Sequence, residues 1–326
     1  MGGNLNPSTI YNTMDFITTA TIGNSADFGD LSSTQTNNTA CSNAVRGISA
    51  GGDSPSTNRI EFVTIATLGN SLDFGDLTQS INATGQGFAS RTRAFRAGGY
   101  ISGYNNNIDF WTITSDGNAI DFGDMLAAKQ AVGALSNSTR GVISSGSDAS
   151  NAINVIQFVT MSSTGNALDF GDLTQARKSR CVASPTRGLM MGGNLNPSTV
   201  YNIIDFITIA SEGNAADFGD LPATNTNQTG CSNAVRGISA GGDSTNRIEF
   251  VTIATLGNAQ DFCDLTRNAA SCGSAASPTR FTVFGGDSSN VIEYHEIMST
   301  GNTIDFGDLT QSVSETAGCS NGHGGL

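Results

Sequence analysis

The sequence predicts an all-β protein built from seven copies of one unit. The tetrad Asp-Phe-Gly-Asp occurs seven times at intervals of 44 to 48 residues, with Cys263 replacing the glycine once. Each copy contains short runs of alternating apolar and polar residues, whereas no segment has the length and periodicity of a helix. A fixed interval of this size indicates one repeated supersecondary unit, here filling a single domain over residues 1–326. The tetrads begin at Asp27, Asp73, Asp121, Asp169, Asp217, Asp261 and Asp305.

Each unit is expected to fold as four short strands. In the unit between residues 39 and 79, the second predicted strand ends in the pair Gly51-Gly52, and a variable loop leads to the third. The alternation in that third strand indicates a half-buried strand, and a turn around Gly69-Asn70 joins it to the fourth. The four predicted strands cover residues 39–43, 46–52, 59–65 and 71–77. Four short strands per unit are typical of a propeller blade.

The two ends of the chain read as parts of one strand. The C-terminal sequence from His323 to Leu326, joined to Met1-Gly2-Gly3, reproduces the internal segment 187–193. One blade is therefore expected to take its first strands from the C-terminus and its third and fourth strands from residues 9–31. A solenoid would instead require capping units at both ends. The sequence thus predicts a seven-bladed β-propeller of four-stranded blades, closed by pairing N- and C-terminal strands in one shared blade.

Composition limits the classes of partner. The net charge of −13 and the pI near 4.3 argue against nucleic-acid binding, which requires a basic surface. No apolar run approaches the ~20 residues of a membrane helix, and no signal peptide is recognised at the N-terminus. The cysteines lack paired metal-ligand spacing and are expected to be free, small, buried thiols. They are Cys41, Cys181, Cys231, Cys263, Cys272 and Cys319.

The repeated aromatic and basic positions are interpreted as structural. Each tetrad phenylalanine is expected to fill the space between blades, where its burial contributes about 1.5–3 kcal/mol. A basic residue stands five positions before each Gly pair, and it is expected to pair with a carboxylate, most simply the second Asp of the tetrad. The alternative is a cationic ring around a central channel that holds a polyanion or a glycan carboxylate. These residues are Arg46, Arg93, Arg140, Arg187, Arg236, Arg280 and, across the joined ends, His323.

No catalytic residue, cofactor site or metal site is expected. The two histidines, His295 and His323, lack the sequence context of a nucleophile or its base, and the repeated aspartates lack the spacing of a calcium loop. The part that differs between copies is the loop after the Gly pair, and binding function tends to lie on such variable loops. The tyrosines of one loop are amphipathic, which suits contact with sugars or proteins. The candidate binding residues are Tyr100, Tyr104, Asn105 and Asn106.

Two resemblances extend this interpretation. A strand ending in a Gly pair, a loop and an aromatic-bearing strand resemble the kelch family of β-propellers. Kelch repeats carry a Trp several residues after the aromatic, whereas Trp111 directly follows Phe110 here, so kelch partner-binding roles are not implied. The string Asn-x-Ile-Asp/Glu-Phe-x-Thr-Ile-Ala-Thr-x-Gly-Asn-Ala-x-Asp-Phe-Gly-Asp-Leu resembles repeats in structural proteins of tailed phages from marine bacteria.

The phage resemblance implies a non-enzymatic structural or adhesion component of a virion, such as a tail fibre, spike or decoration protein. It would lie on the particle surface after synthesis in the host cytoplasm. The expected partners are other virion proteins, a host surface glycan or further copies of the chain, without nucleic acid or membrane insertion. The alternatives are a polysaccharide-acting propeller enzyme and an intracellular kelch-type adaptor for protein interaction. An enzyme would need unlike residues clustered near the axis, and the departures from the repeat do not converge there.

Overall fold

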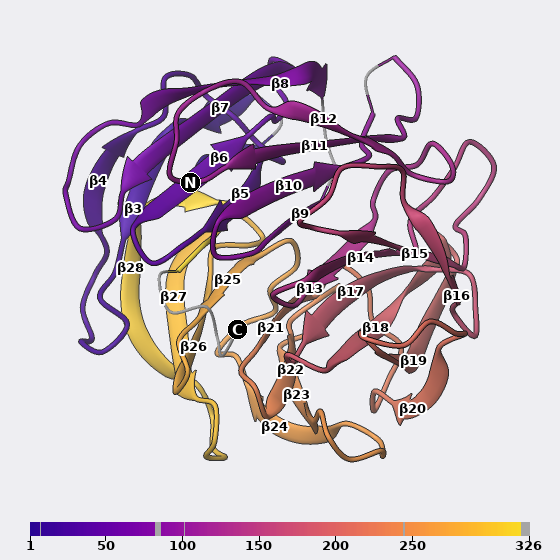
Figure 1. Cartoon of the computed structure of the whole chain (residues 1–326). Helices are drawn as coiled ribbons and strands as arrows, with labels where there is room; N and C mark the ends of the chain where they lie inside the picture. Colours follow the sequence, from indigo (N-terminus) through magenta and orange to yellow (C-terminus); the bar gives the residue numbers. More distant parts are fainter. Residues whose placement is uncertain (7, 82–85, 101, 244, 321–326) are drawn as a thin grey trace.

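The chain folds as a β-propeller of four-stranded blades. The computed structural model describes all residues except 7, 82–85, 101, 244 and 321–326, and the described part contains 28 strands and no helix. Six antiparallel four-stranded sheets follow one another along the chain, each with its strands in sequence order. These sheets are arranged around a common centre (Figure 1). The all-β propeller class predicted from the repeat is therefore confirmed.

Each blade runs from a short inner strand to an outer strand that contains the tetrad. The first three blades are β5 (Thr39–Ser42), β6 (Arg46–Ala50), β7 (Thr57–Thr64) and β8 (Leu72–Ile81); β9 (Gln86–Ala89), β10 (Arg93–Ala97), β11 (Asn107–Thr112) and β12 (Ile120–Asp124); and β13 (Gly133–Ser136), β14 (Arg140–Ser144), β15 (Val155–Thr160) and β16 (Leu168–Asp172). The next three are β17 (Lys178–Ala183), β18 (Arg187–Asn196), β19 (Thr199–Thr208) and β20 (Ala216–Asp220); β21 (Thr229–Ser232), β22 (Arg236–Ala240), β23 (Arg247–Thr252) and β24 (Gln260–Asp264); and β25 (Gly273–Ala276), β26 (Arg280–Phe284), β27 (Ser289–Glu296) and β28 (Ile304–Val313).

The described residues contain six four-stranded blades rather than the predicted seven. The first 30 residues form two two-stranded sheets, β1 (Gly3–Asn6) with β2 (Thr9–Tyr11), and β3 (Thr13–Phe16) with β4 (Ala26–Asp30). The third strand expected there is split between β2 and β3. The C-terminal segment 321–326, which was expected to supply an inner strand and includes His323, lies outside the described residues.

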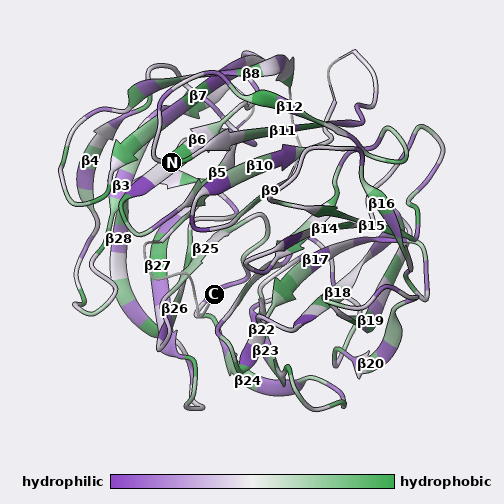
Figure 2. Cartoon of the chain, in the orientation of Figure 1, coloured by the Kyte–Doolittle hydropathy of each residue, from purple (hydrophilic) through white to green (hydrophobic). Residues whose placement is uncertain are grey.

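The third strand of each blade is buried on both faces, whereas the alternating sequence predicted burial on one. Residues 60–63 of β7 are all buried. The reason is that a blade has a neighbour on each face. Phe74, from the tetrad of one blade, packs with Trp111 and Ile113 of the next, which confirms the expected place of this phenylalanine between blades. Hydrophobic residues accordingly concentrate along the strands (Figure 2).

Neighbouring units are joined by one recurrent backbone contact. The glycine amide of the Gly-Asn turn in each unit donates to the tetrad phenylalanine carbonyl of the unit before it. Six of these bonds measure 2.7–2.9 Å: Gly69 to Phe28, Gly117 to Phe74, Gly165 to Phe122, Gly213 to Phe170, Gly257 to Phe218 and Gly23 to Phe306. The last bond connects the indigo segment next to β4 with the yellow strand β28 (Figure 1). These contacts cover part of each outer strand, which would otherwise present unpaired backbone groups.

The tetrad glycine is required by the closeness of this contact. In β12, Gly123 has φ of 140°, and a Cβ atom there would lie 2.6 Å from the carbonyl of Gly165. The tetrad also forms a β-bulge against the third strand, with a register shift between Ile108 and Asp109. Only glycine combines this backbone conformation with so close an approach.

The one tetrad without glycine has the longest junction. Cys263 does not adopt the positive φ of the six tetrad glycines. The bond from the Gly301 amide to the Phe262 carbonyl is 3.5 Å, compared with at most 2.9 Å elsewhere. The neighbouring bond from the Thr303 amide to the Asp264 carbonyl is also long, at 3.3 Å. The side chain of Cys263 therefore holds the two units slightly apart.

A second contact between units involves the acidic or amide residue of the third strand. In six units this side chain accepts a hydrogen bond from a backbone amide of the unit before it. The donor is the second residue after the tetrad of that unit, and the residue between the tetrad and the donor is a leucine or a methionine. The donor and acceptor pairs are Ser32 and Glu61, Thr78 and Asp109, Leu126 and Gln157, Thr174 and Asp205, Thr266 and Glu293, and Thr310 and Asp15, at 2.7–3.2 Å. This contact explains why a polar residue is tolerated inside the blade stack.

One unit lacks this hydrogen bond because proline occupies the donor position. Pro222 has no backbone N–H, and neither carboxylate oxygen of the buried Glu249 has a hydrogen-bond partner among the described residues. The nearest cation, Nε of Arg247, lies 3.5 Å from Oε1. Burial raises the pKa of Glu249 to about 7, and Arg247 only partly opposes that shift.

The junction predicts reciprocal effects of exchanging glycine and cysteine. Gly123→Cys should speed hydrogen exchange of the Gly165 amide and lower the free energy of unfolding by about 1–3 kcal/mol, because a side chain is forced into a strained and occupied position. Cys263→Gly should slow exchange at the Gly301 amide by allowing the bond to shorten. Amide exchange measured by NMR and urea denaturation test both changes. Unchanged exchange at both amides would contradict the role assigned to the glycine.

The proline at position 222 predicts a stability that falls as pH rises. Because the folded-state pKa of Glu249 is raised from 4.5 to about 7, folding retains a proton that the unfolded chain releases between these values. The penalty is absent below about pH 4 and complete above about pH 7, with an upper limit of about 3 kcal/mol. Pro222→Thr supplies the missing N–H, as in four other units, and should flatten the dependence of the unfolding midpoint on pH between 5 and 8. An unaltered slope in this variant would refute the explanation.

Candidate functional site

The six described arginines of the repeated set connect neighbouring blades. Each guanidinium lies over the third-strand aromatic ring of its own blade, 4.1–5.0 Å from the ring centroid. Each Nη1 also donates to a backbone carbonyl of the following unit, at 2.7–3.1 Å. These pairs are Arg46 with Ile113, Arg93 with Met161, Arg140 with Ile209, Arg187 with Ile253, Arg236 with Ile297 and Arg280 with Thr19. These six arginines therefore make contacts between neighbouring blades.

The prediction that these arginines pair with the second Asp of the tetrad is wrong. No described arginine of the set forms an ion pair with the second Asp of a tetrad. In the register of the sheet, Arg46 lies opposite Thr64 at the end of β7, whereas Asp76 lies opposite Arg59 near its start. Five residues of strand, about 17 Å, separate these positions. The carboxylates that do pair with the set belong to Asp116, Glu212 and Glu296.

The same arginines do not form a cationic ring around the axis. The central cavity, with a volume of about 610 Å³, is lined mainly by inner strands, the segments before them and the C-terminal segment 315–318, together with Gly193 and Asn194 of β18. The described arginines of the set stand on the second strands and are absent from this lining. The position of His323 lies outside the described residues. A central cavity is therefore present, but the residues that line it are not the arginines of the repeated set.

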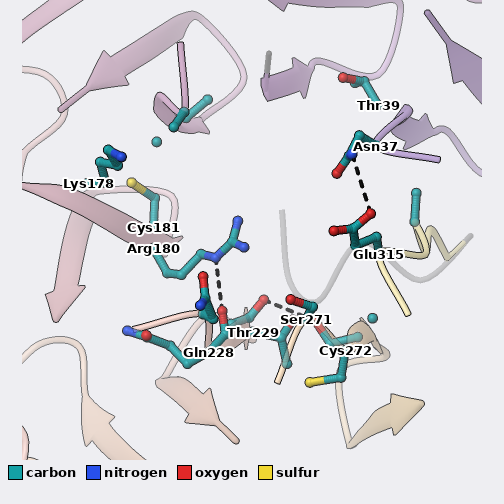
Figure 3. Close-up of a pocket in the computed structure, with 18 of the residues that line it drawn as sticks. Asn37, Thr39, Lys178, Arg180, Cys181, Gln228, Thr229, Ser271, Cys272 and Glu315 are labelled. Atoms are coloured by element: carbon teal, nitrogen blue, oxygen red, sulfur yellow. Dashed lines mark hydrogen bonds between the residues drawn. The ribbon is translucent and has the colours of Figure 1, made fainter. Parts of the chain in front are cut away.

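Three charged side chains line the cavity in the described part of the chain: Lys178, Arg180 and Glu315 (Figure 3). Nε of Arg180 donates to the Gln228 carbonyl at 2.9 Å, and the guanidinium projects from β17 into the cavity. Arg180 is exposed toward the cavity, and partial desolvation by the surrounding strands lowers the pKa of its guanidinium. The only signal in the sequence was that Arg180 replaces a small residue of the repeat, and this was missed.

Glu315 is held by neutral donors on another wall of the cavity. Its Oε2 accepts from Nδ2 of Asn4 at 3.1 Å, from the Thr36 hydroxyl at 3.0 Å and from Nδ2 of Asn37 at 3.5 Å. The bond to Asn37 is visible in Figure 3. Glu315 thus ties the C-terminal segment to the N-terminal part of the chain and forms no ion pair with Arg180.

The six cysteines are free, as expected, but only Cys41 and Cys263 are buried, and the other four are half-buried. Burial raises the pKa of all six thiols, to about 11 in Cys272 and to about 12 in Cys231 and Cys263. A thiol with a raised pKa remains protonated at neutral pH and is a poor nucleophile. No group of three or more His, Cys, Asp or Glu side chains suited to a metal ion occurs among the described residues.

The candidate loop between β10 and β11 contains a paired tyrosine surface. The rings of Tyr100 and Tyr104 lie edge to face with centroids 5.6 Å apart, and both residues are half-buried. Asn105 supports the loop, since its side chain donates to Gln79 and accepts from the Asn107 amide. The Asn106 carbonyl accepts from the Met125 amide. The structure therefore brings the two tyrosines together and gives the asparagines contacts within the fold.

Comparison with protein-family models and with curated proteins identifies no family for this chain. The sequence matches no protein-family model, and no curated protein matches it significantly. Within the described residues, no helix has both the length and the apolarity needed to cross a membrane.

Proposed function

We propose that the protein is a non-enzymatic structural or adhesion component whose propeller presents variable loops to a partner. The observation that supports this proposal is that most of the repeated polar side chains make contacts between units. The arginine set, the tetrads and most of the third-strand acids make contacts between units. Variation between copies is concentrated in the loops after the Gly pairs. A rigid ring with variable loops suits presentation to a partner.

The loop of Tyr100 and Tyr104 is the proposed contact surface. Two half-buried tyrosines held edge to face offer rigid aromatic area together with hydroxyl groups. Such surfaces bind sugars and proteins at a small loss of side-chain entropy. The setting that we propose is the outside of a phage particle, with a host glycan or a neighbouring virion protein as partner. The resemblance of the repeats to structural proteins of marine tailed phages supports this setting.

We further propose that the ring has seven blades and is closed by the two chain ends. The register of β1 with β2, Gly3 opposite Tyr11, matches that of β18 with β19, Gly193 opposite Tyr201. The contact from Gly23 to Phe306, at 2.8 Å, is as short as the other junctions whose tetrad has a glycine. The Met1 amine also donates to the Ala317 carbonyl at 3.0 Å. In this proposal, β1 to β4 and the C-terminal segment form the seventh blade.

Circular permutation tests the closure. Joining Leu326 to Met1 and opening the chain in the loop 148–151 should give a folded protein at least as stable as the original, because the join falls inside one strand. The matched control opens the chain inside β15, which should prevent folding. Thermal unfolding and circular dichroism provide the readout. The original chain, cleaved once in the loop 148–151, shows whether a break there is tolerated. If that cleaved chain stays folded and the loop permutant does not fold, the shared blade is disproved.

Purified particles test the setting and the contact surface together. Mass spectrometry should find the protein in density-purified phage particles from cultures that produce it, and the Tyr100→Ser, Tyr104→Ser double variant should lower adsorption to host cells at least tenfold. Ser150→Ala, in the corresponding loop of the next blade, is the matched control. A protein confined to the soluble fraction, or release of reducing ends from polysaccharide by the pure protein, would argue against this function.

A further inference from the structure

The wall of the central cavity is asymmetric at one position. Arg180 lies opposite Met191 in the register of β17 and β18. The residues at the corresponding place in four other blades, read from the same register, are small: Thr39, Gly133, Thr229 and Gly273. A single guanidinium thus enters the cavity at a level where these four inner strands have small residues and β9 has Gln86.

This guanidinium has no carboxylate partner in the described part of the chain. Only its Nε–H has a described acceptor, the carbonyl of Gln228, whereas an arginine carries five N–H donors. The described ion pairs do not include Arg180, and Glu315 bonds to other donors. Arg180 is exposed to the space of the cavity, so its remaining donors are open to water or to an anionic ligand. The remaining donors face the space of the cavity (Figure 3).

The rest of the lining suits a hydrophilic ligand. Amide and hydroxyl side chains such as Asn37, Asn227, Thr229 and Ser274 contribute to the wall, and Lys178 adds a second cation on β17. None of the described lining residues is aromatic, so stacking or an apolar ligand is not favoured. The volume of about 610 Å³ is within the range of small-molecule sites, about 300–1,000 Å³.

We propose that the central cavity binds a small hydroxylated carboxylate, such as a uronic acid, with Arg180 holding the carboxylate. The planar fork of arginine matches a carboxylate in two parallel hydrogen bonds. The ligand hydroxyls would meet the amides and hydroxyls of the wall. The net charge of −13 opposes approach of an anion, but at physiological salt charges more than about 8 Å away are largely screened. This inference goes beyond the proposed loop-presenting function and does not depend on it.

Calorimetric titration of the full chain with D-glucuronate, in about 0.15 M salt, tests the site. Saturable binding is expected for the unaltered protein and for Arg91→Gln, which removes an exposed charge from the β9–β10 turn. Arg180→Gln should weaken binding at least tenfold, which corresponds to about 1.4 kcal/mol, and Arg180→Lys should lose less. D-Glucose, the uncharged analogue, should not bind measurably.

Several outcomes would overturn the assignment. These are absence of saturable glucuronate binding, binding unaffected by Arg180→Gln in a variant with unchanged circular dichroism, or equal binding of glucose. Sulfate that binds as tightly as glucuronate would show a simple oxyanion site and would overturn the hydroxylated ligand. Because Arg180 makes a single described hydrogen bond, Arg180→Gln is expected to remain folded, and thermal unfolding checks this.

Discussion

The structure depends on the contact between the Gly-Asn turn of one unit and the tetrad of the unit before it. An amide of the turn donates to the tetrad phenylalanine carbonyl, and a second donates to the carbonyl of the last tetrad Asp, as Ser71 does to Asp30. The bulged tetrad glycine lets the two backbones approach this closely. Since the contact is made by backbone atoms at the outer strand, it pairs groups that would otherwise be open to solvent or to another chain.

When the turn lies against the tetrad, the side chains that repeat along the sequence are placed to make contacts between neighbouring units. The tetrad phenylalanine is enclosed between blades, the arginine at the start of the second strand spans to the next unit, and the third-strand acid accepts an amide from the unit before. Departures from the repeat are informative for this reason. Cys263 lengthens a junction and Pro222 leaves Glu249 without its donor, and both effects can be compared with six intact copies in the same molecule.

The cavity departs from the repeat in another manner. At the outer strands and between blades, each unit makes the same contacts with its neighbours, so the same residue types recur. The inner strands surround a shared space, and a change in one unit alters the environment of all of them. Arg180 is such a change. A charge introduced into a space lined by amides and hydroxyls creates a preference for one kind of ligand without disturbing the junctions that hold the ring together.

The amino-acid sequence by itself determined the repeat, the strand-rich unit and the placement of glycines, because local periodicity and backbone tolerance are properties of short segments. It also indicated that the arginine set is structural. It did not reveal the partners of Arg46 and its counterparts, because the relevant carbonyls belong to the next unit, about 60 to 70 residues away along the chain. Burial on both faces of β7, the missing donor for Glu249 and the cavity around Arg180 were likewise decided by tertiary structure. Each depends on which segments of separate units face one another. The spacing of residues within a single unit does not predict these contacts between units.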